Sequence, residues 1–351
     1  MANGTQTLVE GMNFASKAGF LNSYKKLGDY IVKNLNPKFV IRDYQQEGIG
    51  RLIYYLSDYP QKNTPPHLLF HMATGCGKTL LMAANILYLY KQGYRNFVFF
   101  VNSTNIIKKT KANFLDKASS KYLFADRIVF DDREVFIREA GNFEGVNDEN
   151  INILFTTIQG LHSRIWTPQE NAITFEDFNS RKVVFLSDEA HHINALTKRK
   201  DTLSKEEQEE SASWEKTVDR ILRGHSNNIM LEYTATVDLS HNAIRDKYSD
   251  KIIYQYTLRE FREDKFSKDV QILQSDFDMM DRALQAVILS QYRRKVAEKH
   301  KLSLKPVVLI KSQKTIAQSQ QAEKKFKEKI KNLRVEDIKK IQSGNTNGIM
   351  T

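Results

Sequence analysis

The chain has 351 residues, a formal net charge of +11, 41% hydrophobic residues and 27% charged residues. These proportions fit a globular protein with one large α/β domain and part of another, and they exclude a wholly disordered chain. The longest apolar stretch, residues 80–90, is too short to cross a bilayer, and the N-terminus lacks a signal-peptide core. The single cysteine, Cys76, excludes an internal disulfide. We therefore expect a cytoplasmic protein without membrane contact.

The positive charge is concentrated near the C-terminus. Between Gln291 and Lys340, sixteen Lys and Arg residues stand against five Asp and Glu residues, so this segment alone accounts for the net charge. Such a segment is either the solvated surface of helices or a surface for phosphate groups, and charge alone does not separate these two interpretations.

Residues 67–79 have the strand, loop and helix pattern that a phosphate-binding loop requires. An apolar run precedes the sequence His-Met-Ala-Thr-Gly-Cys-Gly-Lys-Thr, and a helix-forming run follows it. Glycines let backbone N–H groups turn toward phosphate oxygens, and the helix directs the positive end of its dipole at the same anion. Lys78 would contact the β- and γ-phosphates, and the Thr79 hydroxyl would join the shell of a Mg²⁺ ion. The residues expected to surround the phosphates are Thr74, Gly75, Cys76, Gly77, Lys78 and Thr79.

Two interpretations of Cys76 remain open. Backbone donors and Lys78 would lower the pKa of its thiol and make it reactive. Alternatively, the loop needs a small residue at this position.

Apolar runs alternate with helical patterns, which predicts an α/β fold with a doubly wound, mostly parallel sheet. We expect strands at residues 67–70, 96–101, 127–130, 151–156, 182–187 and 229–233, and two shorter apolar runs follow at residues 252–256 and 270–273. Helical spacing occurs at residues 20–32, 49–56, 80–90, 106–115, 214–222, 279–299 and 312–331. The highly charged residues 197–210 predict a mobile surface insertion. A further strand at residues 305–310 predicts that a second domain begins there.

Asp188 and Glu189 directly follow the apolar run of residues 182–187. Unpaired charge at the end of a buried strand is costly, and a Mg²⁺ ion beside the phosphate loop would account for the pair. Asp188 would hold the metal, and Glu189 would orient and deprotonate the attacking water. The alternative is an acidic pair on an exposed loop. A zinc site at His191 and His192 is disfavoured, because adjacent side chains do not converge on one ion and no cysteine assists.

Polar residues elsewhere fit a nucleotide site less specifically. The amide of Gln45 presents both a donor and an acceptor to an adenine edge. Thr234 and Thr236 follow a predicted strand and would connect a nucleotide site to a neighbouring lobe through hydrogen bonds. Each of these patterns alone also fits an ordinary turn.

Together, residues 75–79, 188–191 and 234–236 resemble motifs I, II and III of the superfamily 2 (DEAD/DEAH-box) helicases and translocases in order and spacing. Residues 42–45 resemble the upstream glutamine element of that superfamily, and residues 102–104 and 156–159 resemble motifs Ia and Ib. The strings Ser-Asp-Glu-Ala-His-His, Arg-Asp-Tyr-Gln-Gln and Tyr-Thr-Ala-Thr are most similar to the Res (motor) subunit of type III restriction enzymes. Helicases of type I restriction and of repair share much of this pattern.

The resemblance implies ATP hydrolysis with Mg²⁺ that is coupled to movement on duplex DNA, with sequence choice left to a partner methyltransferase (Mod) subunit. It implies that Gln45 binds adenine and that Lys78, Thr79, Asp188 and Glu189 act on the triphosphate, the metal and the water as described above. The residues that would couple nucleotide state to DNA are His191, Thr234 and Thr236. The residues that would lie near the DNA backbone are Ser103, Thr104, Thr157 and Gln159.

The resemblance also implies a domain organisation. Residues 1–38 would be a helical extension, 39–275 a first RecA-like ATPase lobe, 276–304 a linker helix, and 305–351 the truncated start of a second RecA-like lobe. Motifs V and VI, with their catalytic arginine, and any nuclease would lie beyond Thr351. We therefore expect an N-terminal fragment that binds nucleotide, turns over slowly and does not translocate. Three alternatives remain: a helicase motor of type I restriction or of repair, a nucleotide-gated nucleic-acid-binding module with little hydrolysis, and an RNA helicase.

Overall fold

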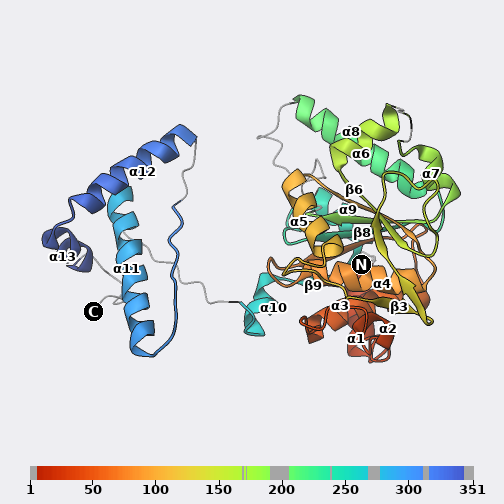
Figure 1. The fold of residues 1–351 in the computed structure, drawn as a ribbon, viewed down its shortest axis with the longest axis horizontal. Helices are drawn as coiled ribbons and strands as arrows, with labels where there is room; N and C mark the ends of the chain where they lie inside the picture. Colours follow the sequence, from red (N-terminus) through yellow and green to blue (C-terminus); the bar gives the residue numbers. More distant parts are fainter. Residues whose placement is uncertain are drawn as a thin grey trace, which may run out of the picture. The chain divides into compact units, whose positions relative to one another are not determined.

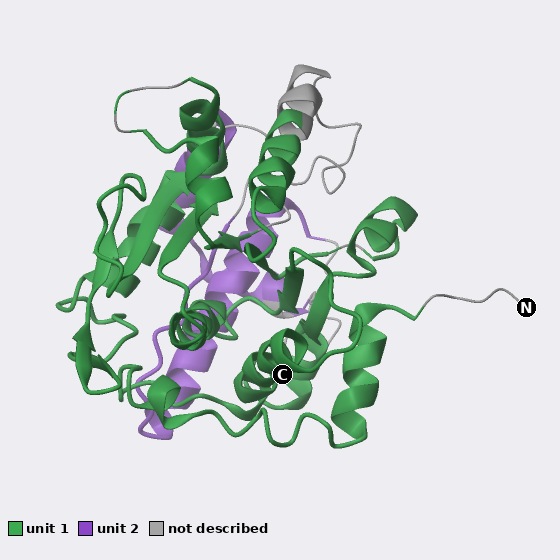
Figure 2. Cartoon of the chain, turned by 90° about the vertical axis from the view of Figure 1, so that its right-hand side faces the viewer, with its two compact units in different colours: residues 1–268 green, residues 269–351 purple. Residues whose placement is uncertain are grey.

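The computed structural model describes residues 6–167, 170, 172–189, 205–237, 239–267, 277–310 and 316–343. The chain divides into two compact units, Met1–Lys268 and Asp269–Thr351 (Figure 2). The first unit contains the sheets. The described part of the second unit contains helices.

Seven strands form one sheet in the order β5-β6-β2-β7-β8-β1-β9. The strands are β1 (His67–Met72), β2 (Asn96–Val101), β5 (Ile137–Glu139), β6 (Ile151–Thr157), β7 (Val183–Asp188), β8 (Ile229–Thr234) and β9 (Ile252–Tyr256). Every hydrogen-bonded pair in this sheet is parallel. Because β8 lies between β7 and β1, the ends of these three strands are neighbours although they are far apart in the sequence.

Strand β2 shows why the sequence forms this sheet. Phe97 and Phe99 belong to the hydrophobic core on one face, while Val98 and Phe100 belong to the core on the other face. A continuous apolar run is therefore needed, as in parallel strands that are covered on both sides. The predicted α/β class with a parallel sheet is confirmed.

Helices cover both faces of the sheet (Figure 1). On one face lie α3 (Asp43–Ser57), α4 (Lys78–Lys91) and α5 (Thr104–Leu115). The other face is covered by α6 (Ile158–Trp166), α7 (Phe175–Ser180), α8 (Lys205–Arg223) and α9 (Asn242–Tyr248). Helix α4 is buried along nearly its whole length, which explains its apolar composition on every side.

The N-terminal residues form helices α1 (Leu8–Lys17) and α2 (Asp29–Val32), which pack on the rest of the first unit. The Leu8 N–H donates to Ser249 O at 2.8 Å, and Arg51 Nη2 donates to Asn13 Oδ1 at 2.9 Å. A continuous helix over residues 20–32 is wrong. Gly19 adopts a left-handed φ of 83° just after α1, and the next helix starts only after Gly28.

The strand predicted at residues 127–130 forms, but outside the main sheet. Strand β3 (Ile128–Phe130) pairs antiparallel with β4 (Arg133–Val135). The two residues between them, Asp131 and Asp132, have φ values of 48° and 64°, which reverse the chain in a tight hairpin. The short edge strand β5 was not predicted, because it contains one apolar residue among two charged ones.

Two further segments named in the sequence analysis lie partly or wholly outside the described residues. Helix α8 begins at Lys205, so residues 205–210 of the predicted mobile insertion are helical, and residues 197–204 lie outside the described residues. The apolar run at residues 270–273 also lies outside them. Helix α10 (Leu258–Glu263) follows β9, and the described part of the first unit ends shortly after it, at Ser267.

The second unit contains α11 (Met279–Lys299), α12 (Ile316–Lys331) and α13 (Val335–Ser343). The buried carboxylate of Asp281 in α11 forms ion pairs with Lys329 and Lys340, which joins the three helices. The strand predicted at residues 305–310 is wrong: this segment has no regular secondary structure, and Val307 and Leu309 are each 88% exposed. A strand needs a neighbour to pair its backbone groups, and the described residues of this unit provide none.

Candidate nucleotide site

The carboxyl ends of β7, β8 and β1 bring separate motifs together. Asp188, the last residue of β7, lies opposite Tyr233 of β8, and Thr234 at the end of β8 lies opposite His71 of β1. The glycine-rich loop leaves β1 one residue beyond His71. In parallel sheets this edge is where ligands bind.

The loop after β1 has the backbone that its glycines allow. Gly75 and Gly77 have φ values of 83° and 82°, in the left-handed region. A Cβ atom added to Gly77 would lie 2.5 Å from Gln45 Nε2, so a side chain does not fit there without displacing Gln45. Gly77 is also the N-cap of α4, and the first N–H groups of this helix therefore face the loop.

Lys78 is the first residue of α4, and its side chain lies inside this loop. It is 9% exposed, and its Nζ is 3.4 Å from Met72 O and 3.5 Å from Ala73 O. These are long contacts for a charged donor, so the ammonium group can exchange them for a stronger acceptor at low cost. Thr79 is half-buried in the first turn of α4, and Thr74 is exposed on the loop.

Tyr44 and Gln45, at the start of α3, hold the phosphate loop through hydrogen bonds. The carbonyl of Cys76 accepts hydrogen bonds from Tyr44 Oη at 2.9 Å and from Gln45 Nε2 at 3.0 Å. Gln45 Oε1 accepts from the Arg42 N–H at 3.0 Å. Gln45 therefore positions the loop, and its contact with adenine stays a prediction. The role of Tyr44 was missed, because a Tyr-Gln pair in a sequence does not show which carbonyl it will reach.

The side chain of Cys76 is buried, and burial raises the pKa of its thiol above the usual value. The positive charge of Lys78 opposes this effect only in part. The interpretation of Cys76 as an activated thiol is therefore wrong, and the need for a small residue stays a prediction.

Asp188 and Glu189 lie at the end of β7. Burial and the adjacent charge of Glu189 raise the pKa of Asp188 to about 6, against the opposing charge of Lys78. Glu189 has a φ of 54°, and its N–H donates to Asp188 Oδ1 at 3.0 Å. A left-handed backbone at a residue other than glycine costs about 1–3 kcal/mol and occurs preferentially at functional sites.

The structure describes two of the three residues that were predicted to couple nucleotide state to DNA. Thr234 Oγ1 accepts from the Thr236 N–H at 3.2 Å, so the two threonines form a compact turn at the end of β8. The neighbouring Tyr233 Oη accepts from Asn85 Nδ2 at 2.8 Å, which ties β8 to α4 behind the phosphate loop. His191 lies outside the described residues.

The residues predicted near DNA lie at the starts of α5 and α6, which follow β2 and β6 at the same edge of the sheet. Gln159 Nε2 donates to Asn102 Oδ1 at 2.8 Å, which joins these two helix starts. Ser103 is the N-cap of α5, and Thr157 caps α6 by accepting from the Gly160 N–H at 3.0 Å. Thr104 and Gln159 are exposed.

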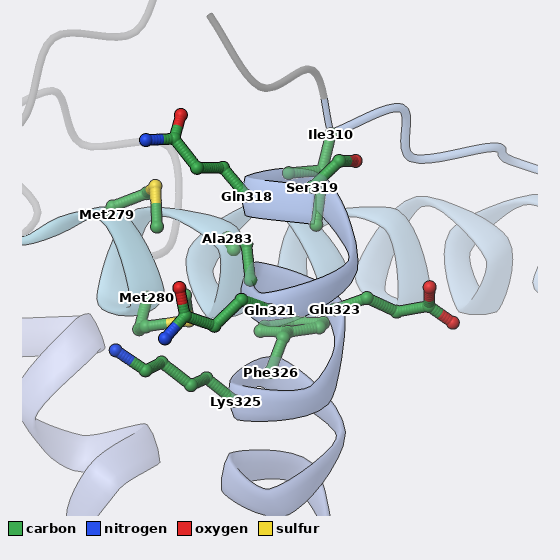
Figure 3. Close-up of a pocket in the computed structure, with 11 residues that line it drawn as sticks. Met279, Met280, Ala283, Ile310, Gln318, Ser319, Gln321, Glu323, Lys325 and Phe326 are labelled. Atoms are coloured by element: carbon green, nitrogen blue, oxygen red, sulfur yellow. The ribbon is translucent and has the colours of Figure 1, made fainter. Parts of the chain in front are cut away.

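A cavity of about 490 Å³ lies elsewhere, between α11 and α12 of the second unit (Figure 3). Met279, Met280, Ala283 and Phe326 contribute to its lining. It contains none of the predicted site residues. No group of three or more His, Cys, Asp or Glu side chains arranged to hold a metal is found among the residues described. Within the same residues, no helix has the length and apolarity needed to span a bilayer.

The fold is that of a RecA-like lobe, with a glycine-rich phosphate-loop sequence at the end of β1 and an acidic pair two strands away in the sheet. The family described as "Type III restriction enzyme, res subunit" matches residues 38–239. This match covers more than half of the chain, and the chain belongs to that family.

A curated relative from Haemophilus influenzae, described as "Probable type III restriction-modification enzyme HindVIP Res subunit", is 39% identical over 317 residues. The alignment covers 84% of this chain and 60% of the relative, so the chain spans about three-fifths of the relative's length.

Similar solved structures include the type ISP restriction-modification enzyme LlaBIII bound to DNA, at 14% identity and a TM-score of 0.47 over 84% of this chain and 22% of that one. The UvsW helicase of bacteriophage T4 is also similar, at 14% identity and a TM-score of 0.38 over 68% of this chain and 67% of that one.

Proposed function

We propose that this chain is part of the motor of a type III restriction enzyme, and that the complete motor binds ATP with Mg²⁺ and hydrolyses it to move on duplex DNA in the cytoplasm. A methyltransferase (Mod) subunit would be its partner. The observation that carries this proposal is the meeting of the phosphate loop with Asp188 and Glu189 at one sheet edge, close enough for Lys78 to affect the pKa of Asp188. Membership of the Res family supports it.

The residues present fit a magnesium nucleotide. Gly75 leaves the loop backbone open, because a Cβ atom there would meet nothing within 4 Å. The nearby donors are the hydroxyl of Thr79 and the carboxylate of Asp188, which are the oxygen ligands that Mg²⁺ prefers beside phosphates. The bound metal would neutralise charge that develops on the phosphate oxygens.

Each residue then has a defined task. Thr79 and Asp188 would hold the metal, and Lys78 would leave its carbonyl contacts to bind the terminal phosphates. Glu189 would orient the attacking water and accept its proton. Tyr44 and Gln45 would fix the loop through the Cys76 carbonyl, because a misplaced loop misplaces every phosphate contact.

The N-terminal ends of α5 and α6 would contact DNA. Ser103, Thr104, Thr157 and Gln159 present hydroxyl and amide groups at the same edge of the sheet, where they would bind backbone phosphates. Such contacts position a strand without reading its sequence, which is consistent with a separate subunit that selects the site.

Binding of a fluorescent ATP analogue with Mg²⁺ tests the nucleotide site. We expect saturable binding by the parent chain and at least a tenfold loss in Lys78→Ala and Asp188→Ala. Lys91→Ala is the matched control: Lys91 ends the same helix but pairs with Asp131 on the surface. Equal binding by the Lys78→Ala and Lys91→Ala variants would reject the site.

A Glu189→Gln variant separates a motor from a nucleotide-gated binding module. In a motor, this variant binds nucleotide but loses hydrolysis, because it cannot accept the proton of the water. Hydrolysis is measured as phosphate release with duplex DNA present. An unchanged rate in Glu189→Gln would show that Glu189 is not the general base.

A further inference from the structure

Trp166, at the C-terminal end of α6, has an unusual orientation. Its indole Nε1–H donates to Thr217 Oγ1 at 2.9 Å, and Thr217 is buried. The polar end of the side chain therefore points inward, yet 51% of the residue is exposed. Tryptophan at a surface usually keeps its polar end in water and buries its carbon ring, so the exposed carbon surface here is energetically unfavourable without a partner.

The ring is held rigidly. Phe175 meets it edge-on, with ring centroids 5.3 Å apart and an interplanar angle of 83°. The His162 ring lies 6.2 Å away and also contacts Thr217, through Nδ1 at 2.8 Å. A side chain that is fixed in this way loses little conformational entropy when it binds a flat ligand.

Arg220 of α8 completes the surface. Its guanidinium carbon lies 3.9 Å from the centroid of Phe175 and 5.2 Å from that of Trp166. Planar guanidinium groups stack on aromatic rings and also bind phosphate. Glu176 of α7 and Asp219 of α8 are exposed acids on the neighbouring helices, and Asp219 is paired with Arg223 at 2.9 Å. The cation stacked on the two aromatic rings is therefore Arg220, which favours an anionic, aromatic partner.

The position on α6 suggests the partner. The helix begins beside Thr157 and Gln159 and ends at Trp166, about 12 Å further on at 1.5 Å per residue. That distance corresponds to about three or four nucleotides of a strand at 3.4 Å each. Figure 1 shows α6, α7 and α8 together on one face of the sheet.

We propose that Trp166 and Arg220 form a stacking platform for an unpaired nucleobase of a strand whose backbone follows α6. An exposed aromatic ring beside a guanidinium binds bases of any sequence, but only where they are unstacked from a duplex. This inference rests on the proposed function, because it takes nucleic acid to bind at the start of α6 and to continue along that helix.

Fluorescence of the full chain tests the platform. The chain has two tryptophans, so Trp214→Phe leaves Trp166 as the only one. We expect oligo(dT) to quench Trp166 and to bind more tightly than an abasic strand with the same number of phosphates. Trp166→Ala should weaken oligo(dT) binding by about 5-fold to 100-fold, as for other stacked bases, without changing abasic binding. Trp166→Phe, which keeps a ring, should show a smaller loss.

Arginine variants provide a matched pair. Arg220→Lys keeps the charge but loses the planar stack, and we expect weaker oligo(dT) binding. Arg223→Lys changes an exposed arginine of the same helix that is already bound to Asp219 at 2.9 Å, and should have no effect.

Equal binding of oligo(dT) and the abasic strand, or no binding of either at low salt, would overturn the proposal. So would a Trp166 signal that follows protein concentration and a dimer mass in light scattering, which would make this surface an interface with a second copy. ATP-analogue binding is measured on the same variants. If the analogue fails to bind but oligo(dT) stacks, the motor assignment fails and the platform remains.

Discussion

The support of the phosphate loop by Tyr44 and Gln45 makes a quantitative prediction. Both side chains donate to the Cys76 carbonyl, at 2.9 Å and 3.0 Å. Tyr44→Phe removes one donor and keeps the ring, which stacks on Tyr256 at 4.2 Å. Gln45→Leu removes the other donor at a similar side-chain volume. Either single variant leaves the carbonyl with one partner, whereas the double variant removes both.

The expected free energies follow from these contacts. Tyr44→Phe loses the hydrogen bond to the Cys76 carbonyl and a long one from Arg42 Nη1 at 3.5 Å, and it should cost about 1 kcal/mol of unfolding free energy. Gln45→Leu also loses the bond from the Arg42 N–H at the start of α3, so it should cost about 2–3 kcal/mol. The double variant leaves the Cys76 carbonyl unsatisfied and should exceed the sum of the single costs by about 1–3 kcal/mol.

Urea unfolding followed by tryptophan fluorescence measures this coupling. Trp166 and Trp214 both lie in the first unit, so the signal reports on the unit that contains the loop. Binding of the fluorescent ATP analogue should weaken in the same order. Costs that add to within about 0.5 kcal/mol would refute the shared-carbonyl explanation, because independent sites show additivity of that size.

Three further predictions concern buried polar groups. Since burial raises the pKa of Cys76, iodoacetamide should modify the folded chain more slowly than the urea-unfolded chain near pH 8, and equal rates would contradict this. Burial opposes ionisation of Glu232, but His67 at 3.3 Å lowers the pKa of that carboxyl; its contribution to stability is therefore present above the usual value of 4.5 and is lost as the pH falls below it. Glu232→Gln should accordingly flatten the pH dependence of urea unfolding between about pH 5 and 3, and an unchanged slope would contradict the pairing. Asn228 accepts from the Val183 N–H at 2.8 Å and donates to three carbonyls at the ends of α7 and α8, so Asn228→Ala should cost roughly 3–5 kcal/mol by urea unfolding, and a cost below about 1 kcal/mol would show that water replaces it.

The sequence by itself determined several local features of this protein. Residues 97–101 have to form a strand buried on both faces because every one of their side chains is apolar, and the glycines of the phosphate loop adopt left-handed backbone. The phosphate-loop sequence and the acidic pair could likewise be recognised without coordinates, because the chemistry of phosphate and magnesium requires those residue types.

Tertiary structure decided which strand ends become neighbours. Nothing local places β8 between β7 and β1, since strand order depends on how helices cover the two faces. The same holds for the Cys76 carbonyl, whose donors lie more than thirty residues earlier, and for Trp166, whose orientation depends on Thr217 some fifty residues later. Tertiary structure also decided the conformation of residues 305–310. This apolar run fits a strand, but no described neighbour pairs with it. Strands, unlike helices, need hydrogen-bond partners from elsewhere in the fold.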